Sequence, residues 1–117
     1  MLAFVKFIGE RVMTVFVLNS PVLTTTGTFR LMPLDIPTAR SLVQGGFISA
    51  IGHEGSATYI GCLLECRVPV QRIDVRMQPG DAAVVLRLLR RLPEGCVLDH
   101  GALAHWPHEV ALLERTA

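Results

Sequence analysis

The sequence predicts a single α/β domain with a central sheet flanked by short helices. Its 117 residues are enough for one hydrophobic core and fall in the usual range for one domain. Runs of β-branched and aromatic residues alternate with two segments that have helical start signals or helical spacing. We take residues 13–117 as the domain, and residues 1–12 as an N-terminal extension that could be loose.

The composition favours a homodimer and argues against long nucleic acids as partners. Half of the residues are hydrophobic and only 18% are charged, which is more apolar surface than so small a domain easily hides. The formal net charge of +1 gives no field strong enough to hold a long nucleic acid. Any phosphate site must therefore be local.

Cysteine usage and hydropathy predict a soluble cytoplasmic protein. An odd number of cysteines suits reduced thiols better than disulfides, and these residues are Cys62, Cys66 and Cys96. Charged residues interrupt the apolar N-terminus, so it is a poor secretory signal. No apolar run approaches the length of about 18 residues that a membrane helix needs, so we expect no membrane contact.

The first half of the chain predicts one strand, one loop and one helix. Residues 13–18 (MTVFVL) form a buried strand that ends at the turn signal Asn19-Ser20-Pro21. Residues 23–29 (LTTTGTF) are typical of a loop or an edge hairpin. A helix is expected from Asp35, with Pro37 in its first turn, to the stop signal Gly45-Gly46.

The second half predicts a second helix and a β-hairpin. The short apolar run 47–51 leads through Gly52 and His53 into a helix over residues 56–64. Residues 70–77 (VQRIDVRM) alternate strictly, and after Pro79-Gly80-Asp81 they are expected to pair with 82–89 as a hairpin. The remaining expected elements are a turn at 92–95, a short helix from Asp99 through Trp106 and a last strand at 110–113.

His53 is the strongest candidate for a catalytic residue. It stands at the predicted start of a helix, directly after Gly52, which lets the backbone approach a ligand closely. The free N–H groups of the helix end favour an anion such as a phosphate, and a bound phosphate favours the protonated imidazole, which can donate a proton to a leaving oxygen. The alternative is a histidine that only caps the helix.

Arginines supply further candidate phosphate contacts. Residues 90–95 (RRLPEG) place Arg90, Arg91 and the carboxylate of Glu94 in one strand-to-turn segment, where arginine can hold a phosphate in a bidentate fashion. Arg72 offers another contact. Each could equally be a solvated surface residue. A metal is not expected, because Cys96, His100, His105 and His108 contain only one close ligand pair.

Three segments resemble a known family, in order along the chain. They are VLNSPVLT at 17–24, GFISAIGHE at 46–54 and RLPEG at 91–95. The family comprises the viral anti-CRISPR ring nucleases and their bacterial relatives, called ring nuclease 2. The resemblance covers about Met13 to Leu98, its most specific part is the SAIGH block, and nothing transfers from Asp99 onward.

The resemblance implies a dimeric fold with a mixed sheet, and metal-independent, cofactor-free cleavage of cyclic tetra-adenylate into linear di-adenylates. This ring is the second messenger of type III CRISPR defence. His53 matches the family's catalytic histidine, and Arg91 and Glu94 match its active-site arginine and glutamate. Asn19 falls at the ligand-contacting strand end, and Arg72 matches a basic position. We add Gly52 and Arg90 as substrate-binding residues.

Two other functions stay open at this point. The first is a non-catalytic dimer that binds nucleic acid, against which the near-zero net charge counts. The second is a sponge that holds the cyclic nucleotide without cleaving it, because family membership does not guarantee activity.

Overall fold

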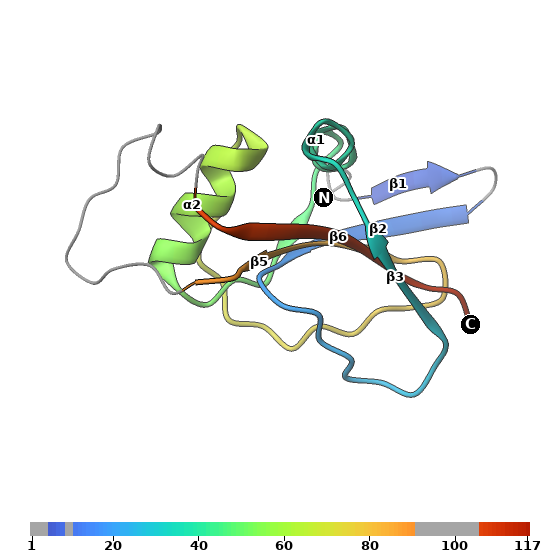
Figure 1. Ribbon diagram of the computed structural model, residues 1–117. Helices are drawn as coiled ribbons and strands as arrows, with labels where there is room; N and C mark the ends of the chain where they lie inside the picture. Colours follow the sequence, from blue (N-terminus) through green and yellow to red (C-terminus); the bar gives the residue numbers. More distant parts are fainter. Residues whose placement is uncertain (1–4, 9–10, 91–105) are drawn as a thin grey trace.

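A six-stranded mixed sheet forms the centre of the single α/β domain (Figure 1). The computed structural model describes residues 5–8, 11–90 and 106–117. The strands are β1 (Val5–Ile8), β2 (Arg11–Leu18), β3 (Phe29–Pro33), β4 (Ile48–Ser49), β5 (Ala82–Leu88) and β6 (His108–Arg115).

The sheet combines parallel and antiparallel pairs in the order β1-β2-β5-β6-β3, with β4 also paired to β2. Strand β2 runs parallel to both β4 and β5, so that Val17 lies opposite Ser49 on one side and Val84 on the other. Strands β1 and β2, β5 and β6, and β6 and β3 are antiparallel. The parallel trio β4-β2-β5 therefore ends at one edge of the sheet.

Two helices cover one face of this sheet, α1 (Ile36–Gln44) and α2 (Glu54–Leu64). Asp35 caps α1, because its side chain accepts a hydrogen bond from the Thr38 N–H at 2.8 Å. This bond lowers the pKa of the Asp35 carboxyl. The core under the helices joins the buried helix residues Tyr59 and Ile60 to Val17 and Val84 of the sheet.

A second core lies on the opposite face. Here the strand residues that alternate with the first set, such as Phe16 and Val85, pack against Val75 and Met77. The segment that carries Val75 is tied to the loop after β2, because the Thr24 hydroxyl donates to the Val75 carbonyl. Irregular chain, and no helix, thus covers this face in the described part of the molecule (Figure 1).

The predicted hairpin between residues 70–77 and 82–89 is wrong. Strand β5 already has β2 on one side and β6 on the other, so it has no free edge for a third partner. Residues 71–78 form no strand, and only Val70 makes an isolated bridge, to Ile51. The alternation matches burial only at the end of the segment, where Val75 and Met77 are buried and Arg76 between them is exposed, whereas Val70 and Ile73 are exposed.

Four other predicted elements agree with the structure, whereas strands β1 and β3 were not predicted. The strand at 13–18, the helix from Asp35 to Gly45, the helix at 56–64 and the last strand at 110–113 are confirmed, and three of these extend by a few residues at one or both ends. The expected turn at 92–95 and nearly all of the helix from Asp99 lie outside the described residues. Within the described ranges, no helix combines the length and apolar character needed to cross a bilayer.

Candidate functional site

Four of the predicted site residues follow directly from the parallel trio of strands. Asn19 comes after β2, Gly52 and His53 follow β4 and the Ile51 bridge, and Arg90 comes two residues after β5. Because β4, β2 and β5 are parallel neighbours, their carboxyl ends meet at the same edge of the sheet. Ligands of open α/β sheets bind outside these carboxyl ends. We call this region the carboxyl edge.

His53 is the N-cap of α2 and is exposed at the carboxyl edge. Its backbone is extended, with φ −128° and ψ 128°, and its Nδ1 accepts a hydrogen bond from the Ser56 N–H at 3.4 Å. Because Nδ1 accepts, the proton of the neutral ring is assigned to Nε2. A bond of 3.4 Å is long and weak. The loss of this capping bond, when His53 turns to a ligand, would therefore cost the helix little stability.

Arg72 reaches the carboxyl edge from the irregular segment and contacts Gly52. Its Nε donates to the Gly52 carbonyl at 3.0 Å. A Cβ atom on residue 52 would lie 2.8 Å from Arg72 Cγ, so only glycine permits this approach. The segment is held beside β4 by Ser49, whose hydroxyl donates to the Pro69 carbonyl at 2.6 Å. The structure therefore brings Gly52, His53 and Arg72 together.

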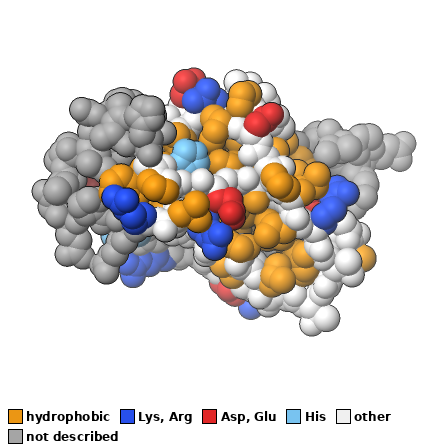
Figure 2. Space-filling view, viewed as in Figure 1, with side chains coloured by type: hydrophobic (Ala, Val, Ile, Leu, Met, Phe, Trp, Pro, Cys, Tyr) orange, Lys and Arg blue, Asp and Glu red, His pale blue; other side chains and the backbone are white. Residues whose placement is uncertain are grey.

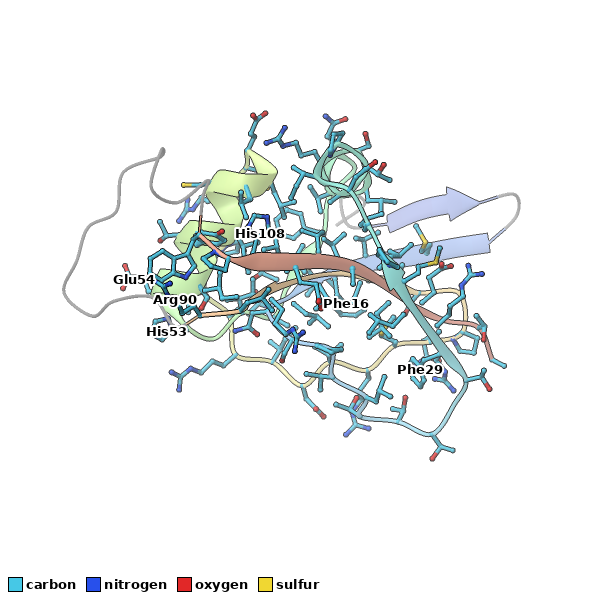
Figure 3. All side chains as sticks on the ribbon, in the orientation of Figure 1. Phe16, Phe29, His53, Glu54, Arg90 and His108 are labelled. Carbon is cyan, nitrogen blue, oxygen red and sulfur yellow. The ribbon has the colours of Figure 1, made fainter. Side chains whose placement is uncertain are left out.

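Arg90 lies at the end of β5 and stacks on an aromatic ring. Its guanidinium carbon is 4.8 Å from the centroid of the Trp106 ring, and the Trp106 indole N–H donates to the Arg90 carbonyl at 2.8 Å. Figure 3 shows His53 and Arg90 at the same end of the molecule. Arg91 and Glu94, the predicted partners of His53, follow Arg90 in the sequence and lie outside the described residues.

A buried hydrogen-bond network behind Trp106 was missed by sequence reasoning. The fully buried Tyr59 of α2 donates its hydroxyl hydrogen to the Trp106 carbonyl at 3.0 Å, and His108 Nδ1 lies 2.7 Å from the same carbonyl. Burial raises the pKa of the Tyr59 hydroxyl. The sequence did contain one indication of this network, the single tyrosine of the chain in an otherwise apolar helix. A tyrosine hydroxyl that is buried usually has a hydrogen-bond partner.

The charges at the carboxyl edge suit an anionic ligand. Within the described residues, Arg72 and Arg90 pair with no carboxylate, whereas the arginines that do so are Arg30, Arg40, Arg76 and Arg87. A guanidinium group and an imidazole at a helix N-terminus are groups that bind phosphates. On the face drawn in Figure 2, described basic side chains are interspersed with hydrophobic and acidic ones and form no continuous stripe.

A groove of about 770 Å³ runs along the flank of α2, next to the carboxyl edge. It begins at Glu54 and continues past Cys62 and Cys66 to Arg67 and Val70. Neither His53 nor Arg72 lines it, so we do not assign the chemistry to this groove. Burial raises the pKa of the Cys66 thiol, which disfavours the reactive thiolate there. In the described part of the chain, no cluster of three or more metal-binding side chains occurs.

Comparison with known proteins identifies relatives encoded by viruses. A family model described as STIV B116-like matches residues 15–110. The solved structure of protein B116 of Sulfolobus turreted icosahedral virus superposes with a TM-score of 0.74, covering 86% of this chain and 98% of that one. The two sequences are 23% identical, so this likeness concerns the fold alone.

Sequence relatives occur in other viruses as well. "Uncharacterized protein ORF117" of Acidianus two-tailed virus is 38% identical over 73 residues, which are 60% of this chain and 62% of the relative. "Uncharacterized protein 26" of a Sulfolobus islandicus filamentous virus is 35% identical over 66 residues, or 56% of each chain. The matched region thus spans less than two thirds of either relative.

Proposed function

We propose that this chain, which belongs to the STIV B116-like family, is a ring nuclease, because His53, the match to the catalytic histidine of that family of nucleases, lies with Gly52 and Arg72 at the carboxyl edge. In this proposal it is a metal-independent phosphodiesterase of the cytoplasm that cleaves cyclic tetra-adenylate into linear di-adenylates. The observation that carries the proposal is the position of His53, exposed at the start of α2 and directly after Gly52, whose carbonyl accepts a hydrogen bond from Arg72. The virus-encoded relatives are consistent with an enzyme that removes a defence signal.

The cleavage needs no metal, because the substrate supplies its own nucleophile. A ribose 2′-oxygen attacks the adjacent phosphorus and its proton passes to solvent, while the bond from phosphorus to the 5′-oxygen breaks. His53 donates a proton to the departing 5′-oxygen, and the products carry a 2′,3′-cyclic phosphate and a 5′-hydroxyl. Two such cuts on opposite sides of the ring release two di-adenylates. Positioning and charge stabilisation supply the rest of the rate enhancement.

Each described residue of the carboxyl edge has a defined part in this scheme. Arg72 and Arg90 hold substrate phosphates, Gly52 allows the close approach of Arg72, and Asn19 contacts the ligand from the end of β2. From the family resemblance, Arg91 stabilises the charge that builds on the reacting phosphate, and Glu94 orients the reacting groups. A homodimer would place two such sites around the two-fold axis of the ring.

The test is cleavage of radiolabelled cyclic tetra-adenylate in the presence of EDTA. Wild-type protein is expected to yield di-adenylate, and His53→Asn is expected to lose about 10² to 10⁴ in rate, the usual worth of a general acid. Asparagine is a good N-cap, so this variant keeps α2 capped and separates chemistry from folding. Arg72→Ala should raise KM, whereas the matched control Arg30→Ala, which removes an arginine paired with Glu114 on β6, should not.

Other outcomes would select the alternative functions. Tight binding of the ring by wild-type protein with no product would favour a sponge. Absence of cleavage, together with binding to duplex DNA that weakens steeply with added salt, would favour a nucleic-acid-binding regulator. Near-full turnover by a folded His53→Asn protein would eliminate the proposed acid.

A further inference from the structure

Trp106 connects the carboxyl edge to the interior of the protein. It is the single tryptophan of the chain, and its half-buried ring packs against the core beneath the helices. On the side of the carboxyl edge it makes two contacts with one residue, the indole N–H bond to the Arg90 carbonyl and the stack under the Arg90 guanidinium. Both the backbone and the side chain of Arg90 are therefore fixed by the same indole.

The backbone of Trp106 is itself anchored. Its carbonyl accepts from the Tyr59 hydroxyl, and His108 Nδ1 lies 2.7 Å away. Because a carbonyl only accepts, this contact is assigned to the tautomer of His108 that carries its proton on Nδ1, and the same Nδ1 lies 2.9 Å from the Tyr59 hydroxyl oxygen. Next to it, the Leu89 N–H donates to the Pro107 carbonyl at 3.0 Å. Trp106 is thus tied to α2, to β6 and to the end of β5.

The stack with Trp106 holds the Arg90 guanidinium, and among the described residues no carboxylate pairs with it. Arg87, three residues earlier on β5, is instead held by a carboxylate, with 3.1 Å between its guanidinium and Glu109. An aromatic face attracts a guanidinium through the ring quadrupole and leaves the full positive charge available to an incoming anion. A cation that is already held in place loses less conformational entropy when it binds a phosphate, which favours binding.

We propose that Trp106 is a positioning residue that holds Arg90 at the carboxyl edge, where the guanidinium binds a phosphate of the substrate ring. This inference rests on the proposed ring nuclease activity and adds a residue outside the three segments that carry the family resemblance. Tyr59 and His108 support Trp106 from behind. Trp106 acts on the substrate only through Arg90.

The test is a double-mutant cycle on KM for cyclic tetra-adenylate. Arg90→Gln is expected to raise KM with little change in kcat, because it removes a binding contact. Trp106→Leu, which removes stack and hydrogen bond, should raise KM about two- to fivefold, the worth of an exposed cation–π contact. Trp106→Phe retains an aromatic face and should recover part of that loss. In the Arg90→Gln background, Trp106→Leu should have no further effect on KM.

The outcomes separate this inference from the proposed function. If wild-type protein cleaves the ring but the KM effects of Arg90→Gln and Trp106→Leu multiply in the double variant, the two residues act independently. That result would overturn the role of Trp106 and leave the proposed ring nuclease function standing. A fall in kcat that only follows the fraction of folded protein, measured by circular dichroism, would assign Trp106 a structural role and also overturn it. No cleavage by wild-type protein would overturn the proposed function itself, and with it the substrate role of Arg90.

Discussion

Replacing Gly52 by alanine should damage the site while leaving the fold intact. The new Cβ would lie 2.8 Å from Arg72 Cγ and 3.2 Å from its Nε, well inside the 3.4 Å at which ordinary contact begins. All three nearest atoms belong to the flexible Arg72 side chain, so that side chain must leave the Gly52 carbonyl. Positive φ occurs at Gly46 and Gly80 but not at Gly52, so alanine fits the backbone.

The magnitudes follow from these contacts. Loss of the exposed hydrogen bond is offset by the lower entropy of the unfolded chain, so stability should change by less than about 1 kcal/mol. Displacement of Arg72 from a substrate phosphate removes a charge-assisted bond worth about 1.5 kcal/mol, which raises KM about tenfold. The assay combines initial rates over a substrate series with urea unfolding of the same samples.

Gly61→Ala is the matched control. Its Cβ would meet the Cys66 backbone carbonyl oxygen at 2.7 Å, and backbone cannot move aside as the Arg72 side chain can. We expect a loss of about 1–3 kcal/mol in stability, typical of overpacking, with KM unchanged in the protein that remains folded. An unchanged KM in folded Gly52→Ala protein would refute the assignment of Arg72 to the site.

Two further predictions concern buried polar groups. Tyr59→Phe should cost about 1 kcal/mol at neutral pH. Because the pKa of Tyr59 is raised in the folded protein, the contribution of its hydroxyl to the free energy of unfolding is complete below pH 10.0, the ordinary pKa, and is lost as the pH rises through the folded-state pKa. In urea titrations at alkaline pH, Tyr59→Phe should therefore lose less stability than wild type. Asp81 accepts from the backbone N–H groups of Thr14 at 3.0 Å and Gln78 at 2.8 Å. Asp81→Ala should therefore cost about 2–4 kcal/mol, and Asp81→Asn about half as much; equal losses in urea would contradict the two-bond account.

The local elements were predictable because each carries its own signal. Asp35 and Pro37 start α1, and the β-branched run of β2 ends at Leu18, directly before the turn signal at Asn19, as expected. The partner of a strand is a different matter, because residues 70–77 alternate in sequence as a strand does and yet form no strand beyond the single bridge of Val70 to Ile51. Periodicity reports which side chains are buried, whereas pairing depends on which edges of the sheet are already occupied by distant strands.

The candidate site was predictable in part. The pattern of a glycine and histidine before a helix located His53 at an exposed N-cap, and Arg72 was proposed from the family resemblance. The role of Trp106 was not predictable, because its partners Tyr59 and Arg90 lie 47 and 16 residues away and meet it only in the folded sheet. Long-range contacts of this kind have no local sequence signature.

The sheet order has a consequence for synthesis of the protein on the ribosome. Strand β3 precedes β4 and β5 in the sequence, yet its partner in the sheet is β6, which follows both of them. Until residues 108–115 leave the exit tunnel, β3 lacks the strand with which it pairs, and its backbone hydrogen-bonding groups stay open. Closure of the sheet is therefore a late event, and a nascent chain stalled shortly before β6 would be a target for chaperones and proteases.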